Sequence, residues 1–227
     1  MLSLTFFTGA GISVEAGLPT FRDSSDLSVD STTEILATKK NWESSPEQVL
    51  DFYNKRRHQA LSVEPTDAHH LIKQLEAYYK VNVITQNIDD LHERANSNSV
   101  THLHGEIMKA QCSGFSEHVI ECKKDISTNC QSIYGYQLRP NVVLFDEPVL
   151  NISKARDICS RTDIFIILGT SLNVQPASLL YQCLPTHAKI YYIDPNPTIF
   201  PAKAKIIKEK AYKGIWCVLN DLVLYER

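Results

Sequence analysis

Two histidines that lie two residues apart, His102 and His104, are the strongest candidates for acid–base chemistry in this chain. An imidazole titrates near neutral pH, so it can take up and return a proton under physiological conditions. In an extended segment both side chains lie on the same face, and Gly105 lets the chain turn directly after them. A single histidine is more often a solvated or hydrogen-bonded side chain than a base, so its position must decide. His104 precedes the turn and lies close in sequence to the polar residues 86–89, and this position favours it as the candidate for acid–base chemistry.

A glycine turn near the start of the chain is a candidate phosphate-binding site. Gly9 and Gly11 follow an apolar run, residues 2–7, and precede a segment with a helical pattern. Backbone N–H groups of such a turn can point at a diphosphate without obstruction by Cβ atoms. The dinucleotide-binding pattern GxGxxG requires glycine at position 14, where Val14 stands, so an ordinary tight turn is an equally good interpretation of the spacing.

Further polar residues follow the glycine turn and the later apolar runs. Phe21 could cover a ring, and Arg22 could contact an anionic or ribose group. Because the carboxyl ends of parallel strands meet at one edge of a sheet, we expect the polar residues after each strand to face a single crevice. They are Gln86, Asn87, Asp89 and Asp90 after one strand, Gly169, Thr170 and Ser171 after a later one, and Asp194 and Asn196 after the next.

Short β-rich runs alternate with longer helical patterns along the chain. This alternation, with several runs that are apolar throughout, predicts an α/β fold with a Rossmann-like parallel sheet and helices on both faces. The predicted strands are Leu2–Phe7, Val81–Thr85, Thr101–Leu103, Val142–Phe145, Asp163–Leu168 and Lys189–Ile193.

Helix starts and interruptions complete this organisation. Ser45, Pro46 and Gln48 have the spacing of a capping box with proline first, which predicts a helix over 45–63, and Thr66 or Asp67 can cap another that runs to about residue 79. Two stretches, 24–45 and 109–140, interrupt the alternation, and we interpret them as insertions that form a small helical and ribbon module. The predicted Rossmann-like domain comprises 1–24, 64–107 and 141–227, and the predicted insertion module comprises 25–63 and 108–140.

Length and composition exclude several other classes. A chain of 227 residues that is 43% hydrophobic can bury one large apolar core. The net charge is -3 and no stretch gathers five basic residues, so general nucleic-acid binding is not expected. The longest strongly apolar run, Ile164 to Leu168, is far shorter than the ~20 residues that span a bilayer, and the first residues lack a basic leader. The few, mostly isolated cysteines suit reduced thiols, so we predict a cytoplasmic protein without a membrane span.

Five motifs together resemble the sirtuin family, in order and spacing over nearly the whole chain. They are Gly9-Ala-Gly-Ile-Ser13, Pro19-Thr-Phe-Arg22, Thr85-Gln-Asn-Ile-Asp89, His102-Leu-His-Gly105 and Gly169-Thr-Ser171. The resemblance implies an NAD-dependent protein-lysine deacylase that acts on acylated-lysine proteins and has a large Rossmann-like domain and a small domain with a zinc ribbon. It also implies a reaction in which the acyl oxygen attacks C1′ of the nicotinamide ribose as nicotinamide leaves. His104 then draws a proton from the ribose hydroxyls, and 2′-O-acyl-ADP-ribose results.

The resemblance assigns roles to individual residues. It implies that His104, Asn87 and Asp89 are catalytic and that NAD contacts arise from three groups of residues. Gly9, Ala10, Gly11, Phe21 and Arg22 would line the diphosphate and the nicotinamide ribose, Gln86, Asn87 and Asp89 would hold the nicotinamide and its ribose, and Gly169, Thr170 and Ser171 the adenosine side. Asp194 stands where an asparagine is common, and its carboxylate can still accept from ribose hydroxyls. Asn196 and Trp216 complete the predicted cofactor contacts.

A further resemblance concerns the substrate backbone. Val142, Phe145 and Glu147 resemble the family's FGE stretch, and residues 172–174 its partner, so a peptide would add as a strand between them. Asp146 replaces the family's usual glycine. This departure could change the conformation of the loop and the binding of the substrate backbone.

The choice of acyl group depends on Tyr53 and Arg56, which lie three residues apart and hence on one helix face. By themselves, a surface tyrosine and a solvated arginine are the simpler interpretation. The pattern Tyr-x-x-Arg, however, resembles the sirtuin subclass that removes succinyl, malonyl or glutaryl groups. A guanidinium and a phenol hydroxyl can hold the distal carboxylate of such a group in an apolar tunnel. We predict a desuccinylase or demalonylase and leave deacetylase activity open.

The family's zinc ribbon has two Cys-x-x-Cys pairs, and this chain lacks them. Cys112 and Cys130 match the first position of each pair, but Phe115 and Ile133 stand at the second positions. Cys122, with a histidine nearby, could complete an irregular site, so the three cysteines are weak zinc candidates. We predict no metal or a degenerate site, and a ribbon held by packing.

Two alternatives to deacylation stay open at this point. Water or another nucleophile could reach C1′, which would give an NAD hydrolase or ADP-ribosyltransferase, and the altered position 146 motivates this reading. The chain could also be a catalytically weak acyl-lysine-binding module, against which the presence of Asn87, Asp89 and His104 argues. The sequence leaves the oligomeric state open.

Overall fold

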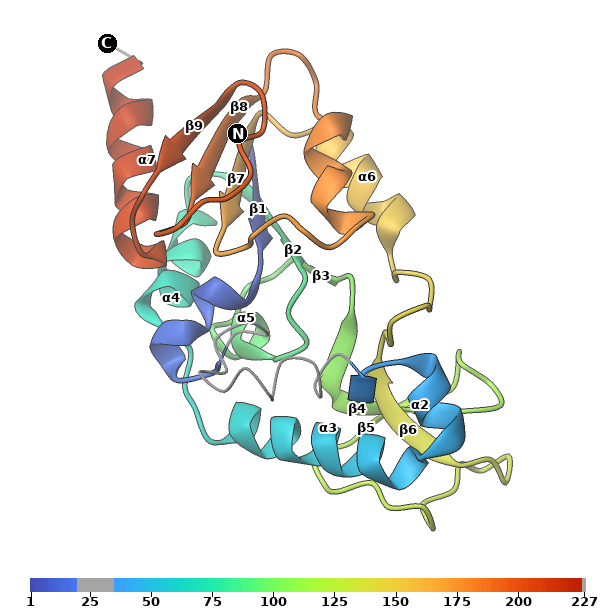
Figure 1. Cartoon of the computed structure of the whole chain (residues 1–227). Helices are drawn as coiled ribbons and strands as arrows, with labels where there is room; N and C mark the ends of the chain where they lie inside the picture. Colours follow the sequence, from blue (N-terminus) through green and yellow to red (C-terminus); the bar gives the residue numbers. More distant parts are fainter. Residues whose placement is uncertain (20–34, 226–227) are drawn as a thin grey trace.

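A six-stranded parallel sheet is the largest element of the computed structural model, which describes residues 1–19 and 35–225 (Figure 1). The strand order is β3-β2-β1-β7-β8-β9, so the chain begins in the middle of the sheet, fills one side and then the other. The strands are β1 (Ser3–Thr8), β2 (Lys80–Thr85), β3 (Val100–His102), β7 (Ile164–Leu168), β8 (Lys189–Ile193) and β9 (Ala204–Ile207). The order reverses between β1 and β7, and a ligand crevice is expected at the carboxyl ends of these two strands.

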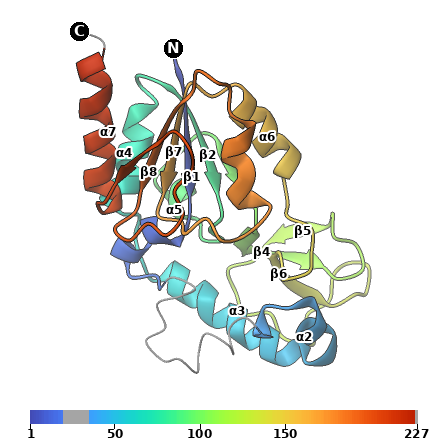
Figure 2. The ribbon, with the colours of Figure 1, turned by 45° about the horizontal axis from the view of Figure 1, so that its top comes forward.

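Helices cover both faces of this sheet (Figure 2). Helices α4 (Asp67–Leu75) and α7 (Ala211–Tyr225) pack on one face, where Ile72 and Ile215 meet Leu4 and Ile166 in one buried cluster. Helix α6 (Ile152–Ser160) and the 3₁₀ segment Ala177–Cys183 cover the other face. Because water reaches neither face, the five residues of β7 are all apolar and buried. The predicted α/β fold with a doubly covered parallel sheet is confirmed.

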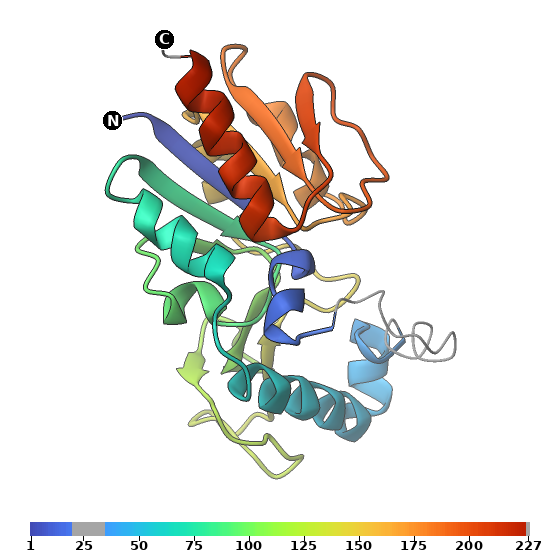
Figure 3. The ribbon, with the colours of Figure 1, turned by 90° about the vertical axis from the view of Figure 1, so that its left-hand side faces the viewer.

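A smaller antiparallel sheet, in the order β5-β4-β6, lies beside the parallel one. Its strands are β4 (Gly105–Cys112), β5 (Val119–Glu121) and β6 (Leu138–Val142). Helix α3 (Pro46–Leu61) runs across this part of the molecule with α2 (Lys39–Ser44) next to it (Figure 3). Val49 and Tyr53 of α3 pack against Ile107 of β4 and Val142 of β6 in a separate buried cluster. The predicted helical and ribbon module is therefore present beside the main sheet.

The segment around Val142 differs from its prediction. We expected a strand over Val142–Phe145 in the parallel sheet, whereas β6 ends at Val142 and pairs antiparallel with β4. Polar side chains and Pro140 make this stretch resemble a loop, but Arg139 is buried through an ion pair with Glu147. Pro140 pairs with Ala110 beside a register shift in β4, and such an irregularity is a position at which a sheet tolerates proline.

Other boundaries also differ from the sequence predictions. The helix expected to reach residue 79 ends at Leu75, and β4, β9 and the short α5 (Leu91–Arg94) were not predicted. Helix α3 begins at Pro46 as predicted, but the Ser45 side chain makes no capping hydrogen bond. The domain limits predicted after residues 107 and 140 fall inside β4 and β6. The division of the chain into two domains stays a proposal. Within residues 1–19 and 35–225, no helix has the length and apolarity needed to cross a membrane.

Candidate active site

The glycine turn after β1 packs directly against the turn after β7. The Gly9 N–H donates to Leu168 O at 3.0 Å, and the Gly11 N–H donates to Gly169 O at 2.8 Å. A Cβ at Gly9 would lie 2.6 Å from Thr170 Cβ, and one at Gly11 would lie 2.6 Å from Gly169 Cα. The N–H groups of Gly9 and Gly11 are therefore bonded within the protein, and the contact of this turn with a diphosphate stays a prediction. Glycine is needed here for the close approach of two backbone segments.

Replacing Gly11 with alanine tests this packing. A Cβ at 2.6 Å from a backbone atom forces the two strand ends apart, so we expect the free energy of unfolding to fall by about 2–3 kcal/mol. Urea denaturation followed by circular dichroism measures the change. Gly135→Ala is the control, since nothing lies within 4 Å of that Cβ and only its positive φ opposes alanine. Equal stability of Gly11→Ala and the natural chain would contradict the close approach.

The strand end of β2 joins this turn through side chains. Gln86 Nε2 donates to Thr170 Oγ1 at 2.8 Å, and the Gln86 N–H donates to Thr8 O at 2.9 Å. The Tyr192 hydroxyl on β8 donates to Thr170 O at 2.8 Å. The polar ends of β1, β2, β7 and β8 are neighbours at one edge of the sheet, as the sequence predicted.

A buried polar chain links the two turns through Ser13. Asn87 Nδ2 donates to Ser13 Oγ at 3.1 Å, and Ser13 Oγ donates to Asp89 Oδ2 at 3.1 Å. Burial raises the pKa of Asp89 to about 6, although hydrogen bonds from the Leu91 N–H and the Ser13 hydroxyl favour the charged form. Ser13 belongs to the glycine motif but was not predicted as a site residue. Only its two partners, more than 70 positions away, reveal its place in the site.

His104 lies against the same loop and keeps one ring nitrogen unpaired. Its Nδ1 lies 2.9 Å from Gln86 O, and a carbonyl only accepts, so Nδ1 carries the proton. Nε2 is buried and has no hydrogen-bond partner among the residues that the structure describes. Burial lowers the pKa of His104, with the Gln86 hydrogen bond opposing, so the ring is neutral near pH 7. A neutral imidazole with a free lone pair is the state that a general base requires.

Asp194, Asn196, Ala10 and Ser171 follow strand ends or lie in the glycine turn, whereas Trp216 lies on α7. Asp194 follows β8, burial raises the pKa of its carboxyl, and Oδ1 accepts from the Asn196 N–H at 2.8 Å. Ala10 accepts from the Ser13 N–H in the turn, and Ser171 is partly buried directly after Thr170. Trp216 is exposed on α7 and contacts Tyr212. Phe21 and Arg22 lie outside the described residues.

The two residues predicted to bind the acyl group come together on α3. Tyr53 is buried in the cluster that contains Val142, and burial raises its pKa far above the usual value although Arg139 and Arg56 favour ionisation. The guanidinium of Arg56 lies 5.4 Å from the centre of the Phe52 ring. Burial lowers the pKa of Arg56, and Tyr53 opposes the shift. The two side chains are thus close enough to influence one another, as the helical spacing predicted.

The predicted peptide-binding loop is anchored from two sides. Glu147 forms a two-pronged ion pair with Arg139, with N–O distances of 2.8 and 2.7 Å, and accepts from the Leu144 N–H. The Phe145 N–H donates to Ala37 O, and Phe145 O accepts from the Lys39 N–H, so this backbone is already paired, while the residue is 44% exposed. The role of Glu147 seen here is to hold the loop.

Asp146 adopts a left-handed conformation with φ of 74°. Glycine accepts this geometry at no steric cost and aspartate tolerates it, so the chain keeps a glycine-like turn. We expect Asp146→Gly to raise the free energy of unfolding by about 0.5 kcal/mol and Asp146→Val to lower it by about 1–2 kcal/mol. Urea midpoints at constant slope measure both changes. A valine variant as stable as the natural chain would show that this position is not constrained.

The predicted zinc candidates do not form a metal site. Cys112 Sγ lies 3.1 Å from Ser132 Oγ, Cys130 Sγ accepts from the Ser127 N–H, and Cys122 Sγ donates to a backbone carbonyl. No group of three or more His, Cys, Asp or Glu side chains in residues 1–19 and 35–225 is placed to hold a metal ion. Phe115, at a position where the family has cysteine, instead packs against Tyr134 and Tyr136. These donors do not fit a tetrahedral zinc ion.

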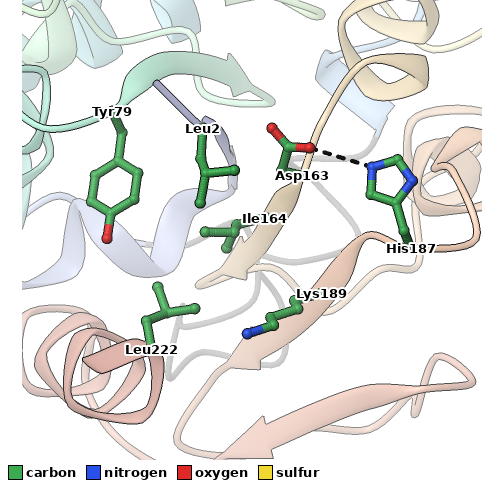
Figure 4. Close-up of a pocket in the computed structure, with 7 residues that line it drawn as sticks. All are labelled: Leu2, Tyr79, Asp163, Ile164, His187, Lys189 and Leu222. Carbon is green, nitrogen blue, oxygen red and sulfur yellow. Dashed lines mark hydrogen bonds and ion pairs between the residues drawn. The ribbon is translucent and has the colours of Figure 1, made fainter. Parts of the chain in front are cut away.

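A cavity of about 190 Å³ lies at the opposite edge of the sheet (Figure 4). Ile164 and Lys189 begin β7 and β8, and Asp163 accepts from His187 at 3.3 Å across its rim. Because the predicted site residues follow the carboxyl ends of the strands, this cavity at the amino ends is separate from them.

Comparison with known proteins places the chain in a family. A sequence model of the Sir2 family matches residues 9–176. An NAD-dependent protein deacylase of Aggregatibacter actinomycetemcomitans is 43% identical over 190 residues, 84% of this chain and 91% of the relative. A protein of the same name from Helicobacter pylori is 39% identical over 225 residues, 98% of each chain.

Solved structures agree with the sequence matches. A Sir2 homologue in complex with NAD has a TM-score of 0.83 and 33% identity, with 98% of this chain and 88% of that chain covered. An ADP-ribose complex of a Sir2 homologue variant has a TM-score of 0.85 and 32% identity, with coverages of 98% and 94%. The glycine turn, the Asn87–Asp89 loop and His104 therefore lie in a shared fold, and the chain belongs to the Sir2 family.

Proposed function

We propose that this Sir2 family member, an NAD-dependent protein deacylase, removes succinyl and malonyl groups from lysine side chains of proteins. Products of the proposed reaction are the free lysine, nicotinamide and 2′-O-acyl-ADP-ribose. The observation that carries the catalytic part is the buried Nε2 of neutral His104, which lies beside the loop of Asn87 and Asp89 and has no partner in the part of the chain that the structure describes.

The residues at this sheet edge suit a dinucleotide. His104 Nε2 and the Asp89 carboxylate can accept from ribose hydroxyls, and the Asn87 side chain can donate or accept. NAD would supply the electrophilic C1′ carbon and nicotinamide as leaving group when bound. In the proposal, Gln86, Asn87 and Asp89 hold the nicotinamide ribose, and Thr170, Ser171 and Asp194 hold the adenosine side. His104 takes the proton from a ribose hydroxyl at Nε2, while Nδ1 stays bonded to Gln86 O.

The acyl preference rests on Tyr53 and Arg56. A buried phenol hydroxyl and a partly buried guanidinium one helical turn apart form a donor pair for a carboxylate. An acetyl group has no distal carboxylate to accept hydrogen bonds from these donors, so they add nothing to the binding of an acetyl-lysine. Val142 lies in the same buried cluster as Tyr53, which supports an acyl site between α3 and β6.

The substrate backbone is proposed to pass between residues 143–147 and 172–174. The Arg139–Glu147 pair fixes the first segment, and Leu172 is buried with a φ of 58° in the second. Because the Phe145 N–H and carbonyl are already paired, a peptide between these segments would contact the exposed Phe145 and Val174 side chains. Asp146 keeps a glycine-like turn, so the loop gives no support to NAD hydrolysis as the main activity.

Mass spectrometry of the reaction products tests the proposal. The purified chain is incubated with NAD and a peptide that carries succinyl-, malonyl- or acetyl-lysine. We expect 2′-O-acyl-ADP-ribose and free lysine from the succinyl and malonyl peptides, and nicotinamide release that requires peptide. Nicotinamide release that is equal with and without peptide would contradict deacylation and identify an NAD hydrolase.

A further inference from the structure

Consecutive backbone carbonyls in the loop after β2 are each held by a histidine. His104 Nδ1 lies 2.9 Å from Gln86 O, and His102 Nδ1 lies 2.9 Å from Asn87 O. A carbonyl oxygen only accepts hydrogen bonds, so each Nδ1 carries a proton. The loop that presents Asn87 is thus fixed by two imidazole rings, one from the end of β3 and one from the bend that follows it.

The second ring nitrogens of the two histidines have different surroundings. His104 Nε2 is unpaired among the described residues, as a base requires. His102 Nε2 lies 2.9 Å from Glu93 Oε1 on α5. An ionised carboxylate also only accepts, so His102 Nε2 must carry a proton as well. With donors at both nitrogens, His102 is an imidazolium, whereas His104 is neutral.

The charged and titratable groups around His102 support this assignment. Glu93 and His92 face it from α5, Glu106 from β4, and Asp89 from the loop after β2. Burial lowers the pKa of His102, but the hydrogen bond and charge of Glu93, with smaller help from Asn87 O and Glu106, outweigh burial and raise it. His92 is fully buried, its pKa is held well below the usual value by burial, and it adds no positive charge.

We propose that His102 is a positioning residue for the deacylation reaction, because its imidazolium clamps the Asn87 backbone to Glu93 and so sets the loop against His104. The inference rests on the proposed function, since it takes His104 as the base. A neutral His102 has one N–H and can serve only one of its two acceptors. Activity therefore requires a neutral His104 and a charged His102, and it falls as pH rises through the pKa of His102.

The Glu93→Gln substitution distinguishes a positioning role of His102 in the reaction from a contribution to protein stability alone. Glu93 has a side chain that is 40% exposed, whereas His102 is 7% exposed, so the glutamate can change without opening the core. The amide carries no charge to hold the imidazolium. Without Glu93, burial lowers the pKa of His102, so the fall of kcat with rising pH should shift to lower pH in the variant than in the natural chain. Between the two pKa values we expect kcat to be about tenfold lower in the variant, with KM for NAD within about twofold throughout. Glu64→Gln is the matched control, since it removes a carboxylate that pairs with Arg94 of the same helix.

Histidine resonances in the NMR spectrum give a readout that does not depend on activity. In the natural chain, we expect His102 to carry two N–H protons at pH 7 and to titrate above the usual range, and in Glu93→Gln to titrate at lower pH. A neutral His102 in the natural chain at pH 7, or a high-pH loss of kcat that is the same in both, would overturn the proposal. If instead no acyl peptide releases nicotinamide, the proposed function fails, while a charged His102 in the spectrum would still identify the clamp.

Discussion

Replacing Arg56 with methionine is expected to lower kcat/KM for a succinyl-lysine peptide by about 100-fold and to change that for an acetyl-lysine peptide by less than about threefold. Two hydrogen bonds from a guanidinium to a carboxylate contribute about 3 kcal/mol, which corresponds to a factor of about 100. Methionine keeps the length and apolar stem of the side chain and removes the charge. Initial rates with both peptides at saturating NAD measure the ratio.

Two further variants sharpen this prediction. Lys55→Met removes the same charge from the adjacent, exposed position of α3, and we expect it to leave the succinyl-to-acetyl ratio unchanged. Tyr53→Phe removes one donor, and about a tenfold loss for the succinyl peptide alone is expected. A ratio that is unchanged in Arg56→Met would contradict the dicarboxylic acyl preference and leave a deacylase of another specificity.

Five of the six strands of the parallel sheet could be predicted from sequence because each carries its own evidence, whereas β9 was not predicted. β7 is apolar at all five positions, which is the pattern of a strand buried on both faces, and the glycine turn after β1 marks where that strand ends. The order of polar strand ends then follows from one rule, that parallel strands finish at the same edge. Local pattern and overall fold agree in this half of the molecule.

The small sheet could not be predicted in the same way, because its burial depends on distant partners. The residues of β6 include Arg139, Pro140 and Asn141, all buried. The ion pair between Arg139 and Glu147 allows an arginine to face inward, and neither residue by itself indicates a strand.

The site shows the same division between local and distant evidence. Gln86 and Thr170 were predicted to share an edge and are hydrogen-bonded across it. Ser13 was missed, since a serine after a glycine turn is common and only contacts with Asn87 and Asp89 give it a role. The charge state of His102 likewise depends on Glu93 of α5, an element too short to be predicted.

Replacing His104 with alanine is expected to reduce the rate of deacylation by about 10³-fold, which is the usual contribution of a positioned general base to a reaction rate. In the proposed sequence of steps, nicotinamide leaves before His104 takes its proton. Exchange of labelled nicotinamide into NAD in the presence of acyl peptide should therefore continue in His104→Ala, while no 2′-O-acyl-ADP-ribose accumulates. Comparing the two assays on the same protein separates loss of the base from loss of NAD binding.

The pH dependence of the natural chain gives an independent check on the same base. Burial lowers the pKa of His104, so its lone pair is free at neutral pH and is lost only as pH falls through that lowered pKa. Asp89, with a pKa of about 6, loses its charge in the same direction. We therefore expect the acid side of the kcat profile to fall below about pH 6. His187→Ala, at the far edge of the sheet, is the histidine control and should leave both rate and profile unchanged. Product formation in His104→Ala at the rate of this control would contradict the assignment of the base.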